Sequence, residues 1–278
     1  MGSRIDRRLI FLDIDGTLAM LGSAPGTATV EAVRTARKNG HMVFLSTGRA
    51  RYGVPSTIEA IGFDGGIYFA GGYAEADCET ILDQPMNASL AKQVIDILQG
   101  ANLIISLECG KCAYQSPKIA ELWKAIGDSS ASTELRRALA DMNGKSLADY
   151  GGEDIYKIGF IASKREDIAA VERRLGDAAK LVRFDNMMPA FPLIFSEISS
   201  WEINKGNALK RICDHLGAAQ EQCVAFGDSM NDSEILQAAG IGVAMGNAED
   251  GLKALADRVC EPCAEDGIAK ELQRIGLV

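Results

Sequence analysis

Asp13-Ile14-Asp15-Gly16-Thr17 stands directly behind the apolar run Leu9-Ile10-Phe11-Leu12. If that run is a strand, Asp13 and Asp15 project to the same side of it, and Gly16 lets the chain turn away without a steric penalty. Two carboxylates at such a short separation repel each other, which indicates a bound cation or a partner that holds a proton. Aspartate is also a covalent nucleophile in phosphoryl chemistry. Because Asp and Gly favour turns as well, the motif alone fits either a turn or a catalytic pair.

The composition narrows the classes of partner. A net charge of −9 argues against nucleic acid or an anionic membrane as the main partner. A small anionic substrate is still compatible, because a metal and a lysine can reverse the sign inside a cleft. No apolar segment approaches the roughly 20 residues of a membrane span, and the N-terminus lacks a signal-peptide core, so a cytoplasmic protein is the default expectation.

Cysteine and histidine usage argues against other chemistries. Seven scattered cysteines fit reduced thiols better than a disulfide framework. The pairs Cys109/Cys112 and Cys260/Cys263 have metal-like spacing, but a joint zinc site would need ligands from two distant segments, and free thiols are the favoured interpretation. His41 and His215 are the only histidines and lie in no motif, so a histidine-assisted serine or cysteine nucleophile is poorly supported.

Strand and helix patterns alternate at both ends of the chain. Such alternation predicts an α/β fold with a doubly wound, Rossmann-like parallel sheet. Near the N-terminus the expected order of strands and helices is Leu9–Leu12, Thr29–Asn39, Met42–Leu45, Pro55–Ile61 and Gly66–Ala70. After Pro192 it is Ala208–Leu216, Cys223–Phe226, Ser233–Ala239, Gly242–Ala244, Asp250–Ala256 and Ile268–Ile275.

The middle of the chain has a different rhythm and carries no concentrated catalytic signature. Its expected helices and strands are Ala88–Leu98, Leu103–Leu107, Ile119–Ile126, Tyr156–Ala162 and Asp167–Leu175. We therefore predict a catalytic core of residues 1–82 and 191–278 and an inserted α+β cap domain of residues 83–190. Cap residues that could select a leaving group include Glu108, Lys111, Tyr114, Arg183 and Asn186, and none of them is favoured.

Polar clusters fall at positions where ligands bind in such a fold. Three lie just past predicted strands, where open α/β sheets form their binding crevice: Asp13/Asp15, Thr47-Gly48, and Asp228 with Asn231 and Asp232. The fourth is Lys205, at the start of a predicted helix. Taken singly, Lys205 fits a solvated lysine, Thr47 an N-cap, and the acids fit turns or caps. Arg49 fits a surface ion pair better than a substrate contact.

Together the clusters resemble the haloacid dehalogenase-like phosphatases, specifically the Cof-type subfamily with a large C2-type cap. Phe-Leu-Asp13-Ile-Asp15-Gly-Thr-Leu is similar to the first motif of that family and Leu-Ser-Thr47-Gly-Arg to the second. Lys205-Gly-Asn-Ala-Leu is similar to the third and Phe-Gly-Asp228-Ser-Met-Asn-Asp232 to the fourth. The segments Gly242–Ala248 and Glu265–Ala269 are also typical of the subfamily.

The resemblance implies a role for each residue. Asp13 would be the nucleophile and Asp15 the acid and base. Oxygens of Asp13, of the Asp15 backbone and of Asp228 would hold Mg²⁺. The phosphoryl oxygens would be bound by Thr47, the Gly48 amide, Lys205 and Asn231, with Asp232 positioning Lys205 or the waters on the metal. Two unit charges 4 Å apart repel by about 4 kcal/mol at an effective dielectric constant of about 20, so an anionic attack on phosphate needs these cations.

The expected function is a Mg²⁺-dependent phosphomonoester hydrolase that acts on a small phosphorylated metabolite, with sugar phosphates favoured, through an aspartyl-phosphate. Cap closure would exclude water from the first step. A phosphotransferase or phosphomutase would use the same Asp13 and is the first alternative. A non-catalytic binding module on this scaffold is less favoured, because the chain retains both Asp13 and Asp15. The oligomeric state is not indicated by the sequence.

Overall fold

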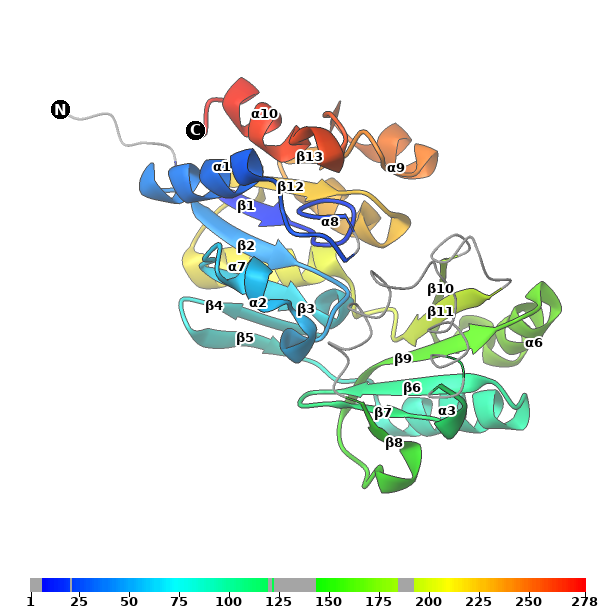
Figure 1. The fold of residues 1–278 in the computed structure, drawn as a ribbon. Helices are drawn as coiled ribbons and strands as arrows, with labels where there is room; N and C mark the ends of the chain where they lie inside the picture. Colours follow the sequence, from blue (N-terminus) through cyan, green and yellow to red (C-terminus); the bar gives the residue numbers. More distant parts are fainter. Residues whose placement is uncertain (1–6, 21, 120–121, 123–143, 185–192) are drawn as a thin grey trace. The chain divides into compact units, whose positions relative to one another are not determined.

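A computed structural model describes residues 7–20, 22–119, 122, 144–184 and 193–278 of the chain (Figure 1). The chain divides into two compact units. The first comprises residues 1–49, 54–83 and 203–278, and the second comprises residues 50–53 and 84–202. None of the described helices has the length and apolar character needed to cross a membrane.

The first unit is built on one twisted sheet of mainly parallel strands. Its strands follow the order β14 (Arg258–Val259), β13 (Ile241–Ala244), β12 (Cys223–Gly227), β1 (Leu9–Leu12), β2 (Met42–Ser46), β3 (Gly65–Tyr68), β4 (Tyr73–Ala76) and β5 (Glu79–Asp83). The strands from β14 to β3 are parallel, and β4 and β5 add an antiparallel hairpin at one edge. Every residue of β1 is buried, as expected of a central strand covered on both faces.

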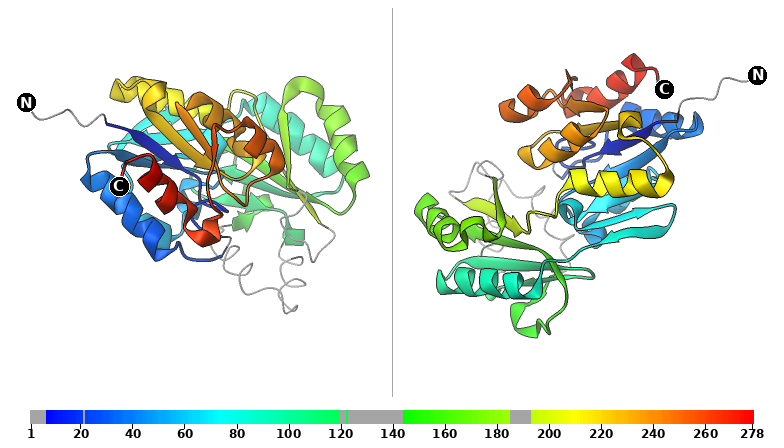
Figure 2. Two further views of the ribbon diagram at one scale, coloured as in Figure 1. Left: turned by 90° about the horizontal axis from the view of Figure 1, so that it is seen from above. Right: turned by 180° about the vertical axis from the view of Figure 1, so that it is seen from behind.

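Helices cover both faces of this sheet (Figures 1 and 2). They are α1 (Thr27–Lys38), α2 (Ser56–Glu59), α7 (Lys205–Leu216), α8 (Ser233–Ala238), α9 (Asp250–Leu255) and α10 (Gly267–Arg274). The pair α1 and α10 lies on one face and the pair α7 and α8 on the other. The core between them includes stacked rings of Phe11 and Phe44, whose centroids are 5.1 Å apart. Burial of such rings is a large hydrophobic contribution to the stability of this unit.

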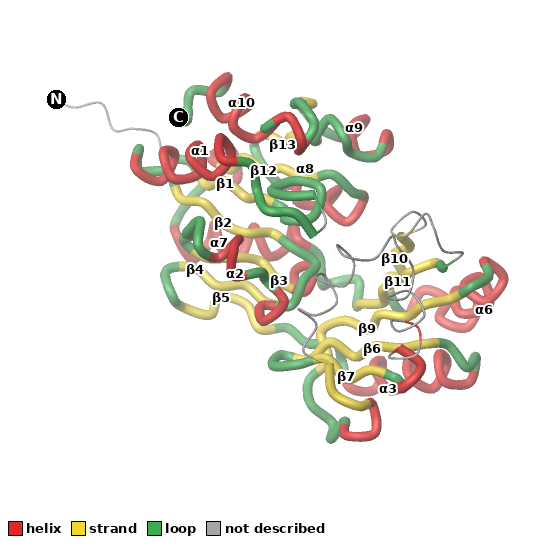
Figure 3. Tube along the Cα trace, in the orientation of Figure 1, coloured by secondary structure: helices red, strands yellow, loops and turns green. Residues whose placement is uncertain are grey.

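In its described residues, the second unit is a mostly antiparallel sheet on which the helices α3 (Ala88–Gly100) and α6 (Arg165–Leu175) pack (Figure 3). The sheet order is β10 (Lys180–Phe184), β11 (Ile194–Ser199), β9 (Ile155–Ala162), β6 (Ile104–Cys109), β7 (Ala113–Gln115) and β8 (Gly144–Ser146). The helices α3 and α6 pack on each other and on β9. Asn87 caps α3, because its Oδ1 accepts hydrogen bonds from the amides of Ser89 and Leu90.

The predicted fold class is confirmed, and the second predicted domain boundary is wrong. We expected the insert to end at residue 190, whereas β11 pairs with β9 and β10, so the second unit runs to Glu202. The strands β4, β5, β7, β8, β10, β11 and β14 were not predicted. Most of the expected helix at 119–126 lies outside the described residues. The candidate Asn186 also lies outside them.

Candidate active site

Lys205 is the centre of a buried charged cluster in the first unit. It is the first residue of α7, and its side chain has no exposed surface. Its Nζ donates to Asp13 Oδ1 at 2.8 Å and to Asp232 Oδ1 at 2.6 Å. A buried ammonium is costly unless anionic partners satisfy it, and these two carboxylates do so. Lys205, the fourth polar cluster of the sequence, therefore contacts the first cluster through Asp13 and the third through Asp232.

Asp232 is a fully buried positioning residue for this lysine. Its Oδ1 accepts from Lys205, and its Oδ2 accepts from the Asp228 amide at 3.0 Å. Both oxygens are thus already used within the protein. This geometry favours the first of the two roles expected for Asp232, that of orienting Lys205, over contact with the waters of a metal.

The loop after β1 holds Asp13 and presents a backbone oxygen. The Asp13 amide donates to Phe226 O, the Gly16 amide to Ala19 O at 2.8 Å, and the Ala19 amide to Ile14 O at 3.0 Å. Gly16 has φ +80°, and a Cβ built on it would lie 2.1 Å from Asp228 Oδ2. Only glycine fits this close approach. The Asp15 carbonyl is not an acceptor in the backbone hydrogen bonds of this loop.

Burial, with a smaller contribution from neighbouring negative charge, raises two pKa values in this cluster. Burial raises the pKa of Asp13 to about 7, although Lys205 acts in the opposite direction. Burial and the neighbouring Asp13 raise the pKa of Asp228 to about 8. Burial disfavours the charge of Lys205, but Asp13 and Asp232 outweigh it and raise its pKa. Three carboxylates thus surround one ammonium, and the cluster lacks positive charge.

The oxygens of this cluster fit a hard divalent cation. One ligand oxygen each from Asp13, Asp228 and Asp232 lie within 4.8 Å of one another. Among the described residues, no hydrogen bond or ion pair is recorded for Asp13 Oδ2 or for the Asp228 carboxylate. Because Asp232 already accepts from Lys205 and from the amides of Asp228 and Ser229, the oxygens better suited to a metal are those of Asp13, Asp228 and the Asp15 carbonyl. Carboxylate and carbonyl oxygens are the ligands that Mg²⁺ prefers.

Asp15 and Thr47 lie at the carboxyl ends of neighbouring strands. Both Asp15 oxygens accept from Arg49, at 2.7 Å from Nε and 2.8 Å from Nη2. Arg49 therefore does form an ion pair, as expected, but its partner is the candidate acid and base. The buried Thr47 accepts at Oγ1 from the Arg49 amide at 3.1 Å, so its hydroxyl proton can be donated elsewhere. Gly48 lies between Thr47 and Arg49, so its amide belongs to the same loop.

The phosphate-binding role expected for Asn231 stays a prediction, while a second asparagine, Asn247, contacts the loop after β1. Asn231 accepts from Ser229 Oγ at 2.8 Å, and the structure records no contact between its side chain and Lys205 or Asp13. Asn247 has no individually predicted role, yet its side chain donates to Gly16 O at 2.9 Å and accepts from the Cys263 amide at 2.8 Å. It thereby braces the nucleophile loop. Its position just past β13, at the same sheet edge as the other clusters, is the signal that could have identified it.

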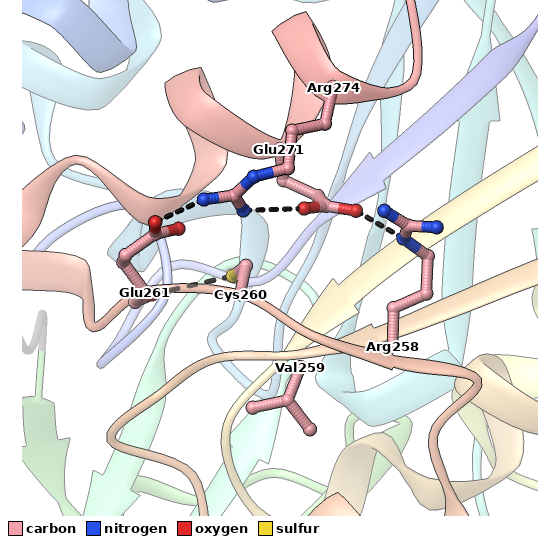
Figure 4. Close-up of a pocket in the computed structure, with 6 residues that line it drawn as sticks. All are labelled: Arg258, Val259, Cys260, Glu261, Glu271 and Arg274. Atoms are coloured by element: carbon pink, nitrogen blue, oxygen red, sulfur yellow. Dashed lines mark hydrogen bonds and ion pairs between the residues drawn. The ribbon is translucent and has the colours of Figure 1, made fainter.

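In a separate polar pocket of the first unit the charged groups pair with one another, and one buried oxygen, Glu261 Oε2, accepts no hydrogen bond among the described residues (Figure 4). The pocket is lined by Arg258, Val259, Cys260, Glu261, Glu271 and Arg274. The carboxylate of Glu271, with 1% of its surface exposed, lies between Arg258 and Arg274, and Arg274 also contacts Glu261. Charge is therefore balanced inside this pocket, and it is best explained as an ion-pair network that ties α10 to the sheet edge.

The cysteine pairs do not form a joint site within either unit. Cys109 and Cys112 belong to the second unit, where the Cys109 amide donates to Cys112 O at 3.1 Å, and Cys260 and Cys263 belong to the first. Seven described cysteines are free thiols. In the described part of the chain, the group of side chains able to hold a metal together is the aspartate cluster.

Comparison with known proteins places the chain in a family. A family model described as haloacid dehalogenase-like hydrolase matches residues 10–272. The chain is 28% identical to the 5-amino-6-(5-phospho-D-ribitylamino)uracil phosphatase YitU of Bacillus subtilis, over 95% of this chain and 96% of that protein. It is 27% identical to the pyridoxal phosphate phosphatase YbhA of Escherichia coli, again over 95% and 96% of the two chains.

A solved structure shows the same fold. It is that of a haloacid dehalogenase-like hydrolase from Bacillus subtilis, which superposes with a TM-score of 0.82 at 26% identity and covers 96% of this chain and 99% of its own. The fold and the names of the relatives together support a phosphatase.

Proposed function

Because the chain belongs to the haloacid dehalogenase-like hydrolases, we propose that it is a Mg²⁺-dependent phosphomonoester hydrolase that works through an aspartyl-phosphate on Asp13. One observation carries this proposal. The buried Lys205 holds Asp13 and Asp232, while the Asp228 carboxylate beside them has no recorded partner among the described residues. The cluster has a nucleophile, a cation for the phosphoryl oxygens and oxygen ligands for a metal.

The first step forms a covalent intermediate. An oxygen of Asp13 attacks the phosphorus of the substrate, and the bond from phosphorus to the leaving oxygen breaks. Asp15 gives a proton to that leaving oxygen, which departs as an alcohol. Lys205, the Thr47 hydroxyl and the Gly48 amide stabilise charge on the three other phosphoryl oxygens. Lys205 also keeps Asp13 in one orientation, since its ammonium is 2.8 Å from Oδ1.

The second step releases phosphate. Asp15, now ionised, takes a proton from a water molecule, and the resulting hydroxide attacks the phosphorus of the aspartyl-phosphate. The bond from phosphorus to Asp13 breaks, and inorganic phosphate leaves. Mg²⁺, held by Asp13, Asp228 and the Asp15 carbonyl, would neutralise the charge that the substrate brings to this acidic cluster.

The proposed substrate is a small phosphorylated metabolite. The names of two relatives specify a phosphorylated ribitylaminouracil and pyridoxal phosphate, which are chemically different leaving groups. Membership of the family therefore does not select one leaving group. Sugar phosphates are the first class to test, and we propose that the second unit provides the residues that choose among them.

Hydrolysis of 4-nitrophenyl phosphate with added Mg²⁺ tests the proposal. We expect stoichiometric release of inorganic phosphate, loss of activity with EDTA, and loss of activity in Asp13→Asn. Arg258→Gln, in the ion-pair network of Figure 4, serves as a control outside the site. Full activity of Asp13→Asn would sink the covalent mechanism. Transfer of the phosphoryl group to an added sugar, with little free phosphate, would favour a phosphotransferase instead.

A further inference from the structure

Arg49 and Asp15 form a two-point ion pair, and both side chains are more exposed than that of Lys205. The guanidinium uses Nε and Nη2 to contact both Asp15 oxygens, at 2.7 and 2.8 Å. The side chains of Arg49 and Asp15 are 18% and 37% exposed, whereas that of Lys205 is fully buried. The Arg49–Asp15 pair is therefore accessible from solvent, whereas the Lys205 ammonium is not.

The pair conflicts with the work proposed for Asp15. An acid and base must direct one carboxyl oxygen at the leaving oxygen and later at a water molecule. In the observed geometry the guanidinium occupies the facing edge of the carboxylate, and each oxygen accepts one of its N–H groups. While this two-point contact lasts, the guanidinium takes one acceptor position on each Asp15 oxygen, so fewer are left for a substrate.

Hydrogen bonds hold the backbone of Arg49, and its guanidinium could bind a phosphate group in place of the Asp15 carboxylate. The Arg49 amide donates to Thr47 Oγ1 at 3.1 Å, and its carbonyl accepts from the Phe69 amide at 2.9 Å. The residue is therefore anchored two positions from the proposed phosphate-binding threonine. A guanidinium fork binds the paired oxygens of a phosphate as well as those of a carboxylate.

We propose that Arg49 is a positioning residue that exchanges partners: it holds Asp15 while the site is empty and transfers to phosphoryl oxygens of the substrate, which releases Asp15 for proton transfer. The inference rests on the proposed function, because it takes a phosphoryl group as the incoming anion. The exchange breaks and forms hydrogen bonds only. Partly exposed ion pairs contribute little net stability, so an incoming dianion can displace this one.

Inorganic phosphate is the probe, and its binding is measured by calorimetry with Mg²⁺ present, without turnover. We expect Arg49→Gln to weaken phosphate binding about tenfold, since one charge-assisted contact is lost, and Arg49→Lys to weaken it less, because the charge stays and the fork is lost. Asp15→Ala should tighten binding several-fold, because Arg49 no longer has a competing partner. In the Arg49→Gln background the same Asp15→Ala change should lose most of this effect.

Arg37→Gln is the matched control. Arg37 makes the same two-point contact with Asp64 in the same unit, at 3.0 Å from Nε and 2.7 Å from Nη2. This control should leave phosphate affinity unchanged, and thermal melting verifies that every variant is folded.

Two results would overturn the exchange. Phosphate affinity within twofold of the original in both Arg49 variants would mean that Arg49 stays with Asp15. Strictly additive effects of Arg49→Gln and Asp15→Ala would mean that they act only through overall charge. A chain that binds phosphate with the expected coupling but hydrolyses no ester would contradict the proposed function and leave the exchange standing, and a chain that binds no phosphate would refute the exchange.

Discussion

Lys205 in the first unit and Lys157 in the second are both buried lysines held between two carboxylates, and their surroundings differ. Lys157, on β9, contacts Glu197 at 2.6 Å and Glu108 at 3.5 Å, on the two adjacent strands. Lys205 contacts Asp13 and Asp232, with Asp228 as a further carboxylate close by. Around Lys157 two carboxylates face one ammonium. Around Lys205 there is one more carboxylate, that of Asp228.

The additional carboxylate, that of Asp228, distinguishes the candidate catalytic cluster around Lys205 from the structural cluster around Lys157. Burial raises the pKa of Glu108 to about 7, much as it raises that of Asp13, so a shifted pKa alone does not distinguish the two clusters. What distinguishes them is that no partner is recorded for the Asp228 carboxylate among the described residues, and that one of its oxygens lies within 4.8 Å of oxygens of Asp13 and Asp232. Excess oxygen donors, rather than burial, mark the site that needs a cation.

The largest expected contrast between the clusters is in catalysis. Asp13→Asn should lower kcat for 4-nitrophenyl phosphate by at least about 10⁴-fold, as loss of a covalent nucleophile does. Steady-state rates and chemical trapping of the phosphoenzyme measure this. The matched change in the second cluster, Glu197→Gln, should alter the same rate by less than about threefold at temperatures where the protein is folded. Equal losses in the two variants would remove the distinction drawn here.

The second contrast is in stability. Lys157→Met leaves the partly buried Glu108 and Glu197 without their cation and should lower the free energy of unfolding by up to about 3 kcal/mol. Adding Glu108→Gln should restore part of that loss, because one uncompensated charge is removed. Urea denaturation of the single and double variants measures both effects. A Lys157→Met variant as stable as the original chain would show that this triad contributes nothing net to folding.

The third contrast is in the response to metal. Mg²⁺ at about 100 times its dissociation constant should stabilise the folded chain by about 2.7 kcal/mol, because it binds only the folded state. Differential scanning calorimetry with Mg²⁺ and with EDTA measures the shift. Asp228→Asn should abolish the stabilisation, whereas Glu108→Gln should retain it. A shift that survives Asp228→Asn would place the ion elsewhere.

The parallel core was predictable because each central strand is a short apolar run that ends in polar residues. Leu9–Leu12 and Cys223–Phe226 were identified to within one residue, since both faces of these strands are buried. The hairpin of β4 and β5 was missed. Its two-residue turn uses Asp77 and Cys78 at φ 50° and 64°, and Cys78 is not a typical residue for that conformation. The mostly exposed β5 also lacks a buried pattern.

The candidate site was predictable as a set of residues but not as a set of contacts. The ends of predicted strands indicated Asp13, Asp228 and Asp232, because parallel strands bring their carboxyl ends to one edge, whereas Lys205 was identified through the family resemblance. The pairing of Asp15 with Arg49 depends on side-chain rotamers. The brace from Asn247 to Gly16 joins positions at opposite ends of the sequence. Neither contact has a local signal in the sequence.

The smallest expected effect concerns pH and Glu108. The folded-state pKa of Glu108 is about 7, above the ordinary value of 4.5 that it has when the chain unfolds. The folded chain therefore holds this proton more tightly than the unfolded chain does. Its contribution to stability is fully present below pH 4.5 and is lost as pH rises through about 7. Glu108→Gln cannot ionise, so its stability relative to the original chain should increase by about 2 kcal/mol between pH 5 and pH 8.

Urea denaturation of both proteins across this range measures the difference. Thr80→Ala, at an exposed position of β5, is a control whose difference from the original chain should not depend on pH. A constant difference for Glu108→Gln as well would mean that Lys157 keeps Glu108 ionised throughout, and the second cluster would then hold two ionised carboxylates against one ammonium.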